Sequence, residues 1–254
     1  MRSLADGRID YVPHDAVGKS RALNLALSRT TAPLLAFTDD DCVLPDGWVS
    51  GAVSALGGAD VVFGNVDAAE HDEDRFFVPK LELQRDELMT LRPLRYPTLV
   101  GMGANMAVRR SVIERVGGFE EELGPGCRFR AGEDCEFAYR VLAGGHTVRR
   151  APGWALVHYG FRRNDGDEAH RLIADSFVGI GVGLGKHVRS GDVRALVACF
   201  GLTGRNLTEV AGRVIRLQRQ LHVRRLLYFW HGVFLGVRAP LVVPPVPPLD
   251  RPTS

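Results

Sequence analysis

The chain has 254 residues, of which 45% are hydrophobic and 24% charged, and its formal net charge is +2. This composition excludes a largely disordered chain, and the length is sufficient to bury the core of one large domain. The charge is unevenly distributed, because ten Lys or Arg residues face only Asp192 and Glu209 between Lys186 and Arg238. We therefore expect a basic C-terminal module on a near-neutral body.

Cysteine usage and apolar stretches indicate a cytoplasmic protein. The four cysteines lack C-x-x-C spacing and the density of a disulfide framework, which favours reduced thiols and argues against a zinc site. The N-terminus lacks the apolar core of a secretory signal. No stretch approaches the roughly 18 apolar residues that a spanning helix needs, and "LLYFWHGVFLGV" at 226–237 is too short.

Strand and helix patterns alternate in the first part of the chain. In order, we expect a short strand at 8–12, a helix at 18–32, a strand buried on both faces at 33–38, a helix at 45–56 and a buried strand at 59–66. This alternation predicts an α/β domain with a largely parallel sheet.

The rest of the chain becomes progressively helical. We expect a charged helix at 76–91, a strand, short helix and Gly-rich loop at 98–126, a helix at 133–143 ended by glycines, two short strands at 146–160, and helices from Asp167 onward. A proline-rich extended tail closes the sequence. The expected units are residues 1–165, 166–240 and 241–254.

Three consecutive aspartates, Asp39, Asp40 and Asp41, follow the apolar run at 33–38. Ligands of open α/β sheets bind at the carboxyl ends of strands, and clustered carboxylates there suit Mg²⁺ or Mn²⁺ bound together with phosphate oxygens. The alternative is a solvated loop with Asp as a helix cap. An EF-hand loop is excluded because Leu44 occupies the place of its required glycine.

Other candidate residues lie near helix and strand ends. Lys19 opens a helix, where a cation and free N–H groups can meet a phosphate, although a simple surface charge fits it as well. Glu133 and Asp134 begin the helix at 133–143, where they either cap it or, because Asp134 borders buried surface, supply a general base. His158 ends an apolar strand and is either structural or an extra metal ligand.

Five segments, in this order, resemble the inverting family-2 glycosyltransferases with the GT-A fold. Across residues 10–160 they read "GKSRALN", "AFTDDDCVLPDGW", "GANMAVRRSVIERVGGFEEEL", "GEDCEFAYRV" and "VHYG". Each segment alone is weakly specific, whereas the complete ordered set is a strong match. The resemblance implies a Rossmann-like mixed sheet with a C-terminal helical extension.

The resemblance also assigns roles to single residues. Asp39 and Asp41 look like the outer aspartates of the D-x-D motif, which holds Mn²⁺ or Mg²⁺ on the donor diphosphate, and His158 looks like the histidine that completes the metal site. Asp40 would lie beside the donor ribose or sugar. The remaining matches are the catalytic base Asp134, its orienting neighbour Glu133, the donor-side residues Lys19 and Asn24, and the sugar-pocket residues Gly103 and Asn105.

The implied activity is metal-dependent, inverting transfer of a sugar from a nucleotide-diphosphate donor to a hydroxyl of a lipid-linked, polysaccharide or other glycoconjugate acceptor. Arg140 is followed by "VLAGG" and not by the tryptophan of the processive Q-x-x-R-W motif, which favours transfer of a single sugar. The alternatives are a non-catalytic remnant or partner subunit, and a metal-dependent phosphohydrolase or nucleotidyltransferase.

Two regions extend or limit this expectation. Family members normally begin with a strand, helix and strand that bind the nucleotide base, so the GT-A-like domain at 1–165 is expected to be incomplete at its N-terminus and to expose an edge of its sheet. The interleaved Arg and aromatic residues at 166–240 favour either peripheral contact with the inner membrane face or packing on the catalytic domain. No nucleic-acid motif accompanies this charge.

Overall fold

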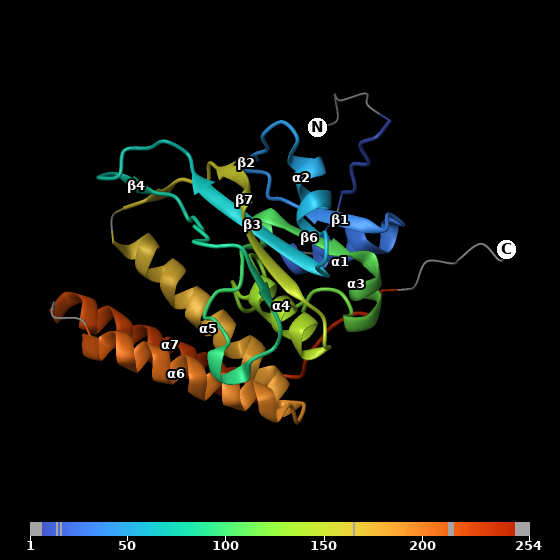
Figure 1. Cartoon of the computed structure of the whole chain (residues 1–254). Helices are drawn as coiled ribbons and strands as arrows, with labels where there is room; N and C mark the ends of the chain where they lie inside the picture. The colour runs from blue at the N-terminus through green and yellow to red at the C-terminus, as the bar shows by residue number, and fades with distance from the viewer. Residues whose placement is uncertain (1–6, 14, 16, 165, 213–215, 247–254) are drawn as a thin grey trace.

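The structure is a computed structural model that describes residues 7–13, 15, 17–164, 166–212 and 216–246. A central sheet has helices on both faces, and three long C-terminal helices form a further layer beyond α4 (Figure 1). This mixed α/β architecture confirms the fold class expected from the sequence. The helical stretch begins at Asp167, also as expected.

The central sheet has the strand order β1-β6-β3-β7-β2, with β5 also pairing with β7. Its only parallel pairing among the described strands is between β3 and β7, so the expectation of a largely parallel sheet is wrong. The strand β6 runs antiparallel between β1 and β3. The strands are β1 Leu34–Phe37, β2 Cys42–Val43, β3 Val61–Ala68, β5 Glu87–Met89, β6 Met106–Arg109 and β7 Val148–His158, while β4 Phe76–Phe77 and β8 Arg162–Arg163 form a separate pair.

The helices α1 to α4 flank this sheet, and α5 to α7 form the further layer. Their bounds are α1 Lys19–Arg29, α2 Trp48–Ala55, α3 Arg110–Val116, α4 Glu133–Ala143, α5 Asp167–Arg189, α6 Val193–Gly212 and α7 Arg216–Arg238, with 3-10 turns at Pro93–Arg95 and Gly103–Asn105. The helix α4 has three acidic residues in its first turn, where the helix dipole favours them. It ends before Gly145, whose φ of 83° suits glycine.

The alternation of β3 side chains builds a core on each face of the sheet. Val61 and Phe63 point into the larger core, which α1, α3, α4 and the C-terminal helices complete. Val62 and Val66 point to the opposite face, where α2 covers them with Trp48. All four β3 side chains have 0% exposure, so both faces exclude water.

Three local expectations are wrong, because pairing with other parts of the sheet determines whether a segment forms a strand. Residues 8–12 form no strand, since no described strand lies beside them. The segment 76–91 is extended and not helical, because Leu81 forms a bridge with Val66 of β3. The region 146–160 contains one strand, β7, in place of two.

The strand β1 lies at one end of the sheet. It was expected to be buried on both faces, yet its residues are only partly buried and Ala36 is exposed. Among the described strands it pairs with β6 alone. Among the described strands, β1 is thus an edge strand of the central sheet.

The helix α5 is fixed to the body by buried charges. Lys186 has 0% exposure and its Nζ lies 2.8 Å from Glu120 Oε2 and 2.6 Å from Glu122 Oε2. The neighbouring His187 Nε2 lies 2.9 Å from Glu136 Oε1. Removing one partner of such a buried pair leaves an uncompensated charge, which makes these contacts strong constraints on the position of α5.

The side chain of Arg140 joins α4 to the segment at the end of α3. Arg140 binds Glu136 through both carboxylate oxygens, with N···O distances of 2.8 and 2.9 Å. The same guanidinium donates hydrogen bonds to the carbonyl oxygens of residues 116–118. Although Glu136 is buried, Arg140 and His187 lower its pKa to about 2, so it stays ionised.

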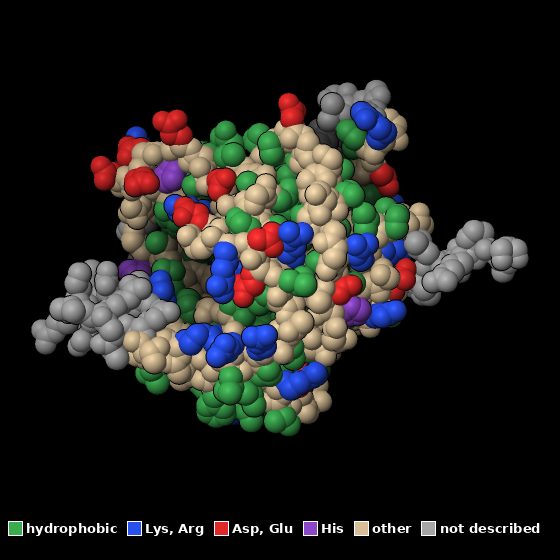
Figure 2. Space-filling view, viewed as in Figure 1, with side chains coloured by type: hydrophobic (Ala, Val, Ile, Leu, Met, Phe, Trp, Pro, Cys, Tyr) green, Lys and Arg blue, Asp and Glu red, His purple; other side chains and the backbone are tan. Residues whose placement is uncertain are grey.

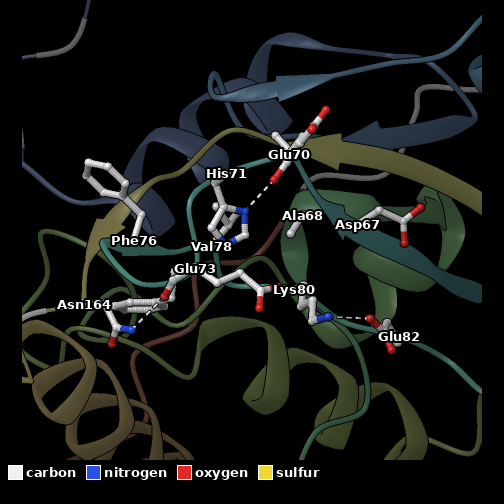
Figure 3. Close-up of a pocket in the computed structure, with 12 residues that line it drawn as sticks. Asp67, Ala68, Glu70, His71, Glu73, Phe76, Val78, Lys80, Glu82 and Asn164 are labelled. Carbon is white, nitrogen blue, oxygen red and sulfur yellow. Dashed lines mark hydrogen bonds and ion pairs between the residues drawn. The ribbon is translucent and has the colours of Figure 1, made fainter.

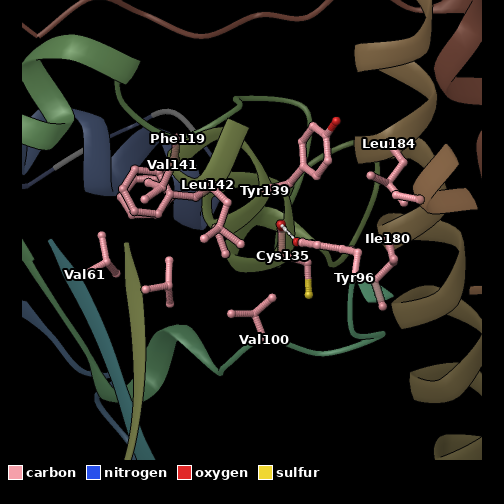
Figure 4. Close-up of a cluster of buried hydrophobic side chains, with 14 of the residues drawn as sticks. Val61, Tyr96, Val100, Phe119, Cys135, Tyr139, Val141, Leu142, Ile180 and Leu184 are labelled. Carbon is pink, nitrogen blue, oxygen red and sulfur yellow. Dashed lines mark hydrogen bonds between the residues drawn. The ribbon is translucent and has the colours of Figure 1, made fainter. Parts of the chain in front are cut away.

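Apolar contacts join α5 to the same body. Ile180 and Leu184 of α5 point toward Tyr96 and Cys135 (Figure 4), and all four side chains belong to the larger core. The helices α5 and α7 then pack backbone to backbone, since a Cβ at Gly181 would lie 2.1 Å from the carbonyl oxygen of Phe229. No described helix is long and apolar enough to cross a membrane.

The proline-rich end was expected to be an extended tail. Its residues 241–246 have no regular secondary structure and lie along 118–121. The amide of Gly118 donates to Pro244 O at 2.9 Å, and that of Glu121 donates to Val242 O at 3.1 Å. Residues 247–254 of the expected tail lie outside the described residues.

Candidate active site

Asp41, Cys42 and His158 form a group whose potential ligand atoms all lie within 4.8 Å of one another. The group is assembled by the pairing of β2 with β7, in which Cys42 stands opposite His158. A backbone bond from Tyr159 N to Asp41 O, 2.7 Å long, continues this pairing. Carboxylate, thiolate and imidazole groups are all donors that divalent cations accept.

The hydrogen bonds of His158 orient one ring nitrogen toward Asp41. Its Nδ1 lies 2.7 Å from Pro79 O, and because a carbonyl oxygen only accepts, Nδ1 carries the proton. In neutral imidazole, Nε2 then offers a lone pair, and this atom lies 3.3 Å from Asp41 Oδ2. A backbone carbonyl that fixes the tautomer in this way is typical of metal-binding histidines.

Gly160 keeps space open beside these two side chains. A Cβ at this position would lie 2.4 Å from His158 Nε2 and 2.8 Å from Asp41 Oδ2. Only a residue without a side chain leaves the ligand atoms accessible. The donor set and this space therefore fit a divalent cation.

Asp39 does not join this group, contrary to the expected pairing of Asp39 with Asp41. Its Oδ1 lies 2.5 Å from Lys19 Nζ, at the start of α1. Lys19 Nζ also lies 3.9 Å from Glu133 Oε1. Burial opposes the charge on Lys19, but the attraction of Asp39 and Glu133 is larger, and its pKa is raised. The structure thus places Asp39 in a salt bridge with the cation of α1.

Asp134 is held by backbone amides. Gly103 N donates to its Oδ2 at 3.1 Å, and Cys135 N donates to its Oδ1 at 2.7 Å. Hydrogen bonds to the ionised form stabilise a carboxylate and fix its direction. Its neighbour Glu133 is 6% exposed, and burial together with the charge of Asp134 raises the pKa of Glu133 to about 7.

A cavity of about 280 Å³ brings most of these side chains together. Lys19, Asp39, Glu133 and Asp134 form its charged end. The cavity also contacts Pro79, whose carbonyl holds His158, so the metal-ligand group and the cavity adjoin. The other lining residues are Leu99, Met102, Gly103, Ala104, Pro125, Arg130, Ala131, Gly132, Cys135, Leu172, Ser176 and Ile180.

Two expected substrate-binding residues, Asn24 and Asn105, make hydrogen bonds within the fold. Asn24 accepts a hydrogen bond from Phe119 N at 2.7 Å and donates to Phe119 O at 2.9 Å, so it joins α1 to the loop after α3. Asn105 is fully buried and accepts a hydrogen bond from Trp48 Nε1 at 3.0 Å. Neither lines the cavity, and Asp40 is exposed outside it as well.

Sequence reasoning missed the contribution of α5. Leu172, Ser176 and Ile180 come from this helix and form one wall of the cavity. Their spacing of four residues places them on one helix face, a signal that the sequence contained. The sequence could not show that this face turns toward Asp134. It also missed Arg130, an exposed cation at the cavity.

A larger cavity of about 570 Å³ lies beyond the end of β3 (Figure 3). It is open and acidic, with Glu70, Glu73 and Glu82 around it, and Lys80 forms a 2.7 Å ion pair with Glu82. None of the sequence-predicted site residues lines this cavity. The larger volume of this cavity therefore does not make it a better candidate for the active site than the cavity next to Asp134.

Comparison with known proteins supports the mixed α/β fold described above. The family model for Glycosyl transferase family 2 matches residues 1–117, which confirms the expected resemblance in that region. The mannosyltransferase PcManGT from Pyrobaculum calidifontis, solved in complex with GDP-Man and Mn²⁺, has a TM-score of 0.51 and 16% identity over 87% of this chain and 66% of that one. S. aureus TarS 1–349 has a TM-score of 0.46 and 14% identity over 85% and 60% of the two chains. Curated protein sequences gave no significant match.

Proposed function

From the Glycosyl transferase family 2 match over residues 1–117, we propose that the chain transfers a sugar from a nucleotide-diphosphate sugar to an acceptor hydroxyl, with inversion at the anomeric carbon. The observation that carries this proposal is the adjacency of two groups with different chemistry. The Asp41 and His158 pair adjoins, through Pro79, the cavity that contains Asp134. A cation held by Asp41 and His158 suits the departing diphosphate, and the carboxylate of Asp134 suits the attacking hydroxyl.

The chain's own residues would hold a divalent cation at this site. Asp41 supplies a carboxylate oxygen and His158 its Nε2, while Cys42 is a third potential ligand. Mn²⁺ is the better match to an imidazole and Mg²⁺ to an all-oxygen site, and we propose that either can serve. The bound ion would neutralise charge that develops on the leaving diphosphate.

Lys19 would add a second positive charge on the donor side. It is the first residue of α1, where the positive end of the helix dipole favours an anion, although the backbone N–H of Lys19 itself donates to Pro125 O at 2.9 Å. In the absence of donor, Asp39 neutralises it. We propose that donor phosphate oxygens compete with Asp39 for this ammonium group.

Asp134 would act as the general base. Its carboxylate, oriented by Gly103 N and Cys135 N, borders the cavity and can take the proton of an acceptor hydroxyl as that oxygen attacks. Glu133, next to Asp134 and near Lys19, would orient the substrates. With one base and one leaving group, a single displacement inverts the anomeric centre.

The proposal is tested by incubating the protein with Mn²⁺ and a panel of UDP-, GDP- and dTDP-sugars and measuring release of nucleoside diphosphate. The expected result is metal-dependent release from at least one donor, increased by added acceptor. The matched control is the same mixture with EDTA. Donor binding without any release would contradict the proposal and indicate a non-catalytic remnant or a partner subunit.

We further propose that the acceptor is part of a glycolipid or polysaccharide under assembly and that the outer helices contact the inner membrane face. Exposed apolar side chains follow one stripe of α6, at Val193, Phe200 and Leu207, with exposures of 70, 58 and 53%. Figure 2 shows hydrophobic side chains gathered over α6 below a row of basic ones. Such a combination complements an anionic lipid surface.

This membrane contact predicts binding to vesicles that contain anionic lipid. The Phe200→Ser variant should bind phosphatidylglycerol-containing vesicles several-fold more weakly, because burying a Phe side chain contributes about 1.5–3 kcal/mol when complete. Co-sedimentation measures this binding. The control is Val49→Ser on α2, which is 68% exposed but outside this surface. Equal sedimentation of both variants and the unmodified protein would contradict the proposed contact.

A further inference from the structure

The cavity next to Asp134 has two chemically different walls. Its charged end comes from α1, the end of β1 and the start of α4, which place Lys19, Asp39 and Asp134 there. Most of the other lining side chains are apolar and come from residues 99–104, where Gly103 touches Asp134, and from α5, while the exposed Arg130 also lines the cavity. Among the described lining residues there is no aromatic side chain. The division suggests a ligand with a polar end and an apolar end.

The α5 wall is a fixed part of the site. A Cβ at Gly179 would lie 2.2 Å from Ala131 O and 3.1 Å from Gly132 N, so the helix backbone touches the segment that leads directly into Glu133. The buried ion pairs of Lys186 hold the same helix farther along its length. Any group bound between Asp134 and α5 therefore meets a surface whose position is set before binding.

Two side chains give this wall its apolar character. Ile180 is 7% exposed at the inner part of the wall, and Leu172 is 37% exposed. Two helical turns separate them, so an apolar group of about 10 Å could lie along both. Ser176 lies between them in sequence, but its hydroxyl donates to Leu172 O at 2.7 Å, which leaves it less available to a ligand.

We propose that the acceptor is amphipathic, with a hydroxyl presented to Asp134 and an apolar aglycone that lies against Leu172 and Ile180 of α5. This proposal rests on the proposed glycosyltransferase function and narrows its acceptor class. Removal of the apolar group from water supplies binding energy away from the reacting atoms, which helps to position the hydroxyl. A free sugar would fill only the polar end of the cavity.

Alkyl glucosides test this proposal through binding, without a need for turnover. We expect n-octyl β-D-glucoside, below its micelle concentration, to bind the full chain at least about tenfold more tightly than methyl β-D-glucoside. Protein NMR with labelled Ile and Leu methyl groups should show octyl-dependent shifts at Ile180 and Leu172. Affinity that rises further from octyl to decyl indicates a lipid chain, whereas phenyl β-D-glucoside binding as tightly as octyl indicates a compact aglycone.

Two variants at exposed leucines, which should both fold, test the contact with α5. Leu172→Gln should weaken octyl glucoside binding by about tenfold, because the apolar contact with the octyl chain is lost. The substitution should be tolerated by the fold, because Leu172 is 37% exposed. The matched control Leu88→Gln, at a 56% exposed position on β5 outside the cavity, should leave binding unchanged. Equal binding of methyl and octyl glucosides, or equal loss in both variants, would overturn the proposal.

The same measurements separate this inference from the proposed function. If octyl glucoside binds at α5 while no nucleotide-sugar is turned over, the function fails and the amphipathic site stands. If nucleotide-sugars are turned over but acceptors with and without an apolar aglycone react equally, the inference fails and the function stands.

Discussion

The Asp134→Asn variant is expected to lose about 10²–10⁴-fold in the rate of sugar transfer, the contribution that a positioned general base makes. Asparagine has nearly the same shape, and its single amide oxygen can keep one of the two hydrogen bonds, from Gly103 N or from Cys135 N. Its amide cannot take up the proton of the acceptor hydroxyl. The expected loss therefore appears in kcat, while the affinity for nucleotide-sugar and Mn²⁺ stays close to that of the unmodified protein.

The control for this prediction is Asp46→Asn, an exposed aspartate before α2 that does not line the cavity. Steady-state kinetics with the best donor of the panel, together with a thermal unfolding curve for each variant, separate catalysis from stability. A rate within a few-fold of that of the unmodified protein would mean that another group removes the proton. An equal loss in both variants would show that the effect is not specific to Asp134.

The Asp41→Ala variant is expected to bind Mn²⁺ far more weakly than the unmodified protein. Loss of a residue that only supports a ligand costs about 10–100-fold in metal affinity, so loss of a direct ligand should exceed this range. His158→Ala should have a comparable effect, because the two side chains face each other at 3.3 Å. Titration of free Mn²⁺ by electron paramagnetic resonance measures the affinity without any need for turnover.

The neighbouring aspartates supply the controls for the metal prediction. Asp40→Ala, at an exposed position, should leave the affinity for Mn²⁺ alone unchanged. Asp39→Ala should change it only slightly, since Asp39 is bound to Lys19 and not to the Asp41 and His158 pair. If Asp39→Ala abolishes Mn²⁺ binding while Asp41→Ala retains it, the ligand assignment derived from the structure is wrong.

Part of the site could be predicted because its residues lie in ordered sequence motifs. Asp41 and His158 are 117 positions apart, yet their segments were both recognised, and the pairing of Cys42 with His158 brings them together. The start of α4 at Glu133 was also predicted, since acidic residues favour a helix N-terminus and Gly145 ends the helix. The start and end of α4 depend mainly on local sequence, whereas the approach of Asp41 to His158 depends on the pairing of β2 with β7.

The remaining features depend on contacts that a linear pattern does not contain. Asp39 and Asp41 are equivalent in the D-x-D pattern, but Lys19 binds only the first. Asn24 and Asn105 lie in matching segments, but neighbouring backbone and Trp48 satisfy their hydrogen bonds. The segment 76–91 has a charged composition compatible with a helix, but its pairing with β3 keeps it extended.

The role of α5 shows the same dependence on tertiary structure. From the charge and aromatic content of 166–240 we expected either contact with a membrane face or packing of these helices on the body. The structure buries Lys186 at 0% exposure and places Ile180 at the cavity next to Asp134. For α5, contact with the body is therefore direct, while α6 presents the exposed apolar stripe.

We propose that this chain binds a nucleotide-diphosphate sugar through a divalent cation held by Asp41 and His158. Calorimetric titration of UDP-, GDP- and dTDP-sugars, with Mn²⁺ and with EDTA, tests it most directly. At least one donor should bind about tenfold or more tightly with Mn²⁺ than with EDTA, and Asp41→Ala should remove this difference. Donor binding that is equally strong with EDTA, or that keeps its Mn²⁺ dependence in Asp41→Ala, would contradict it.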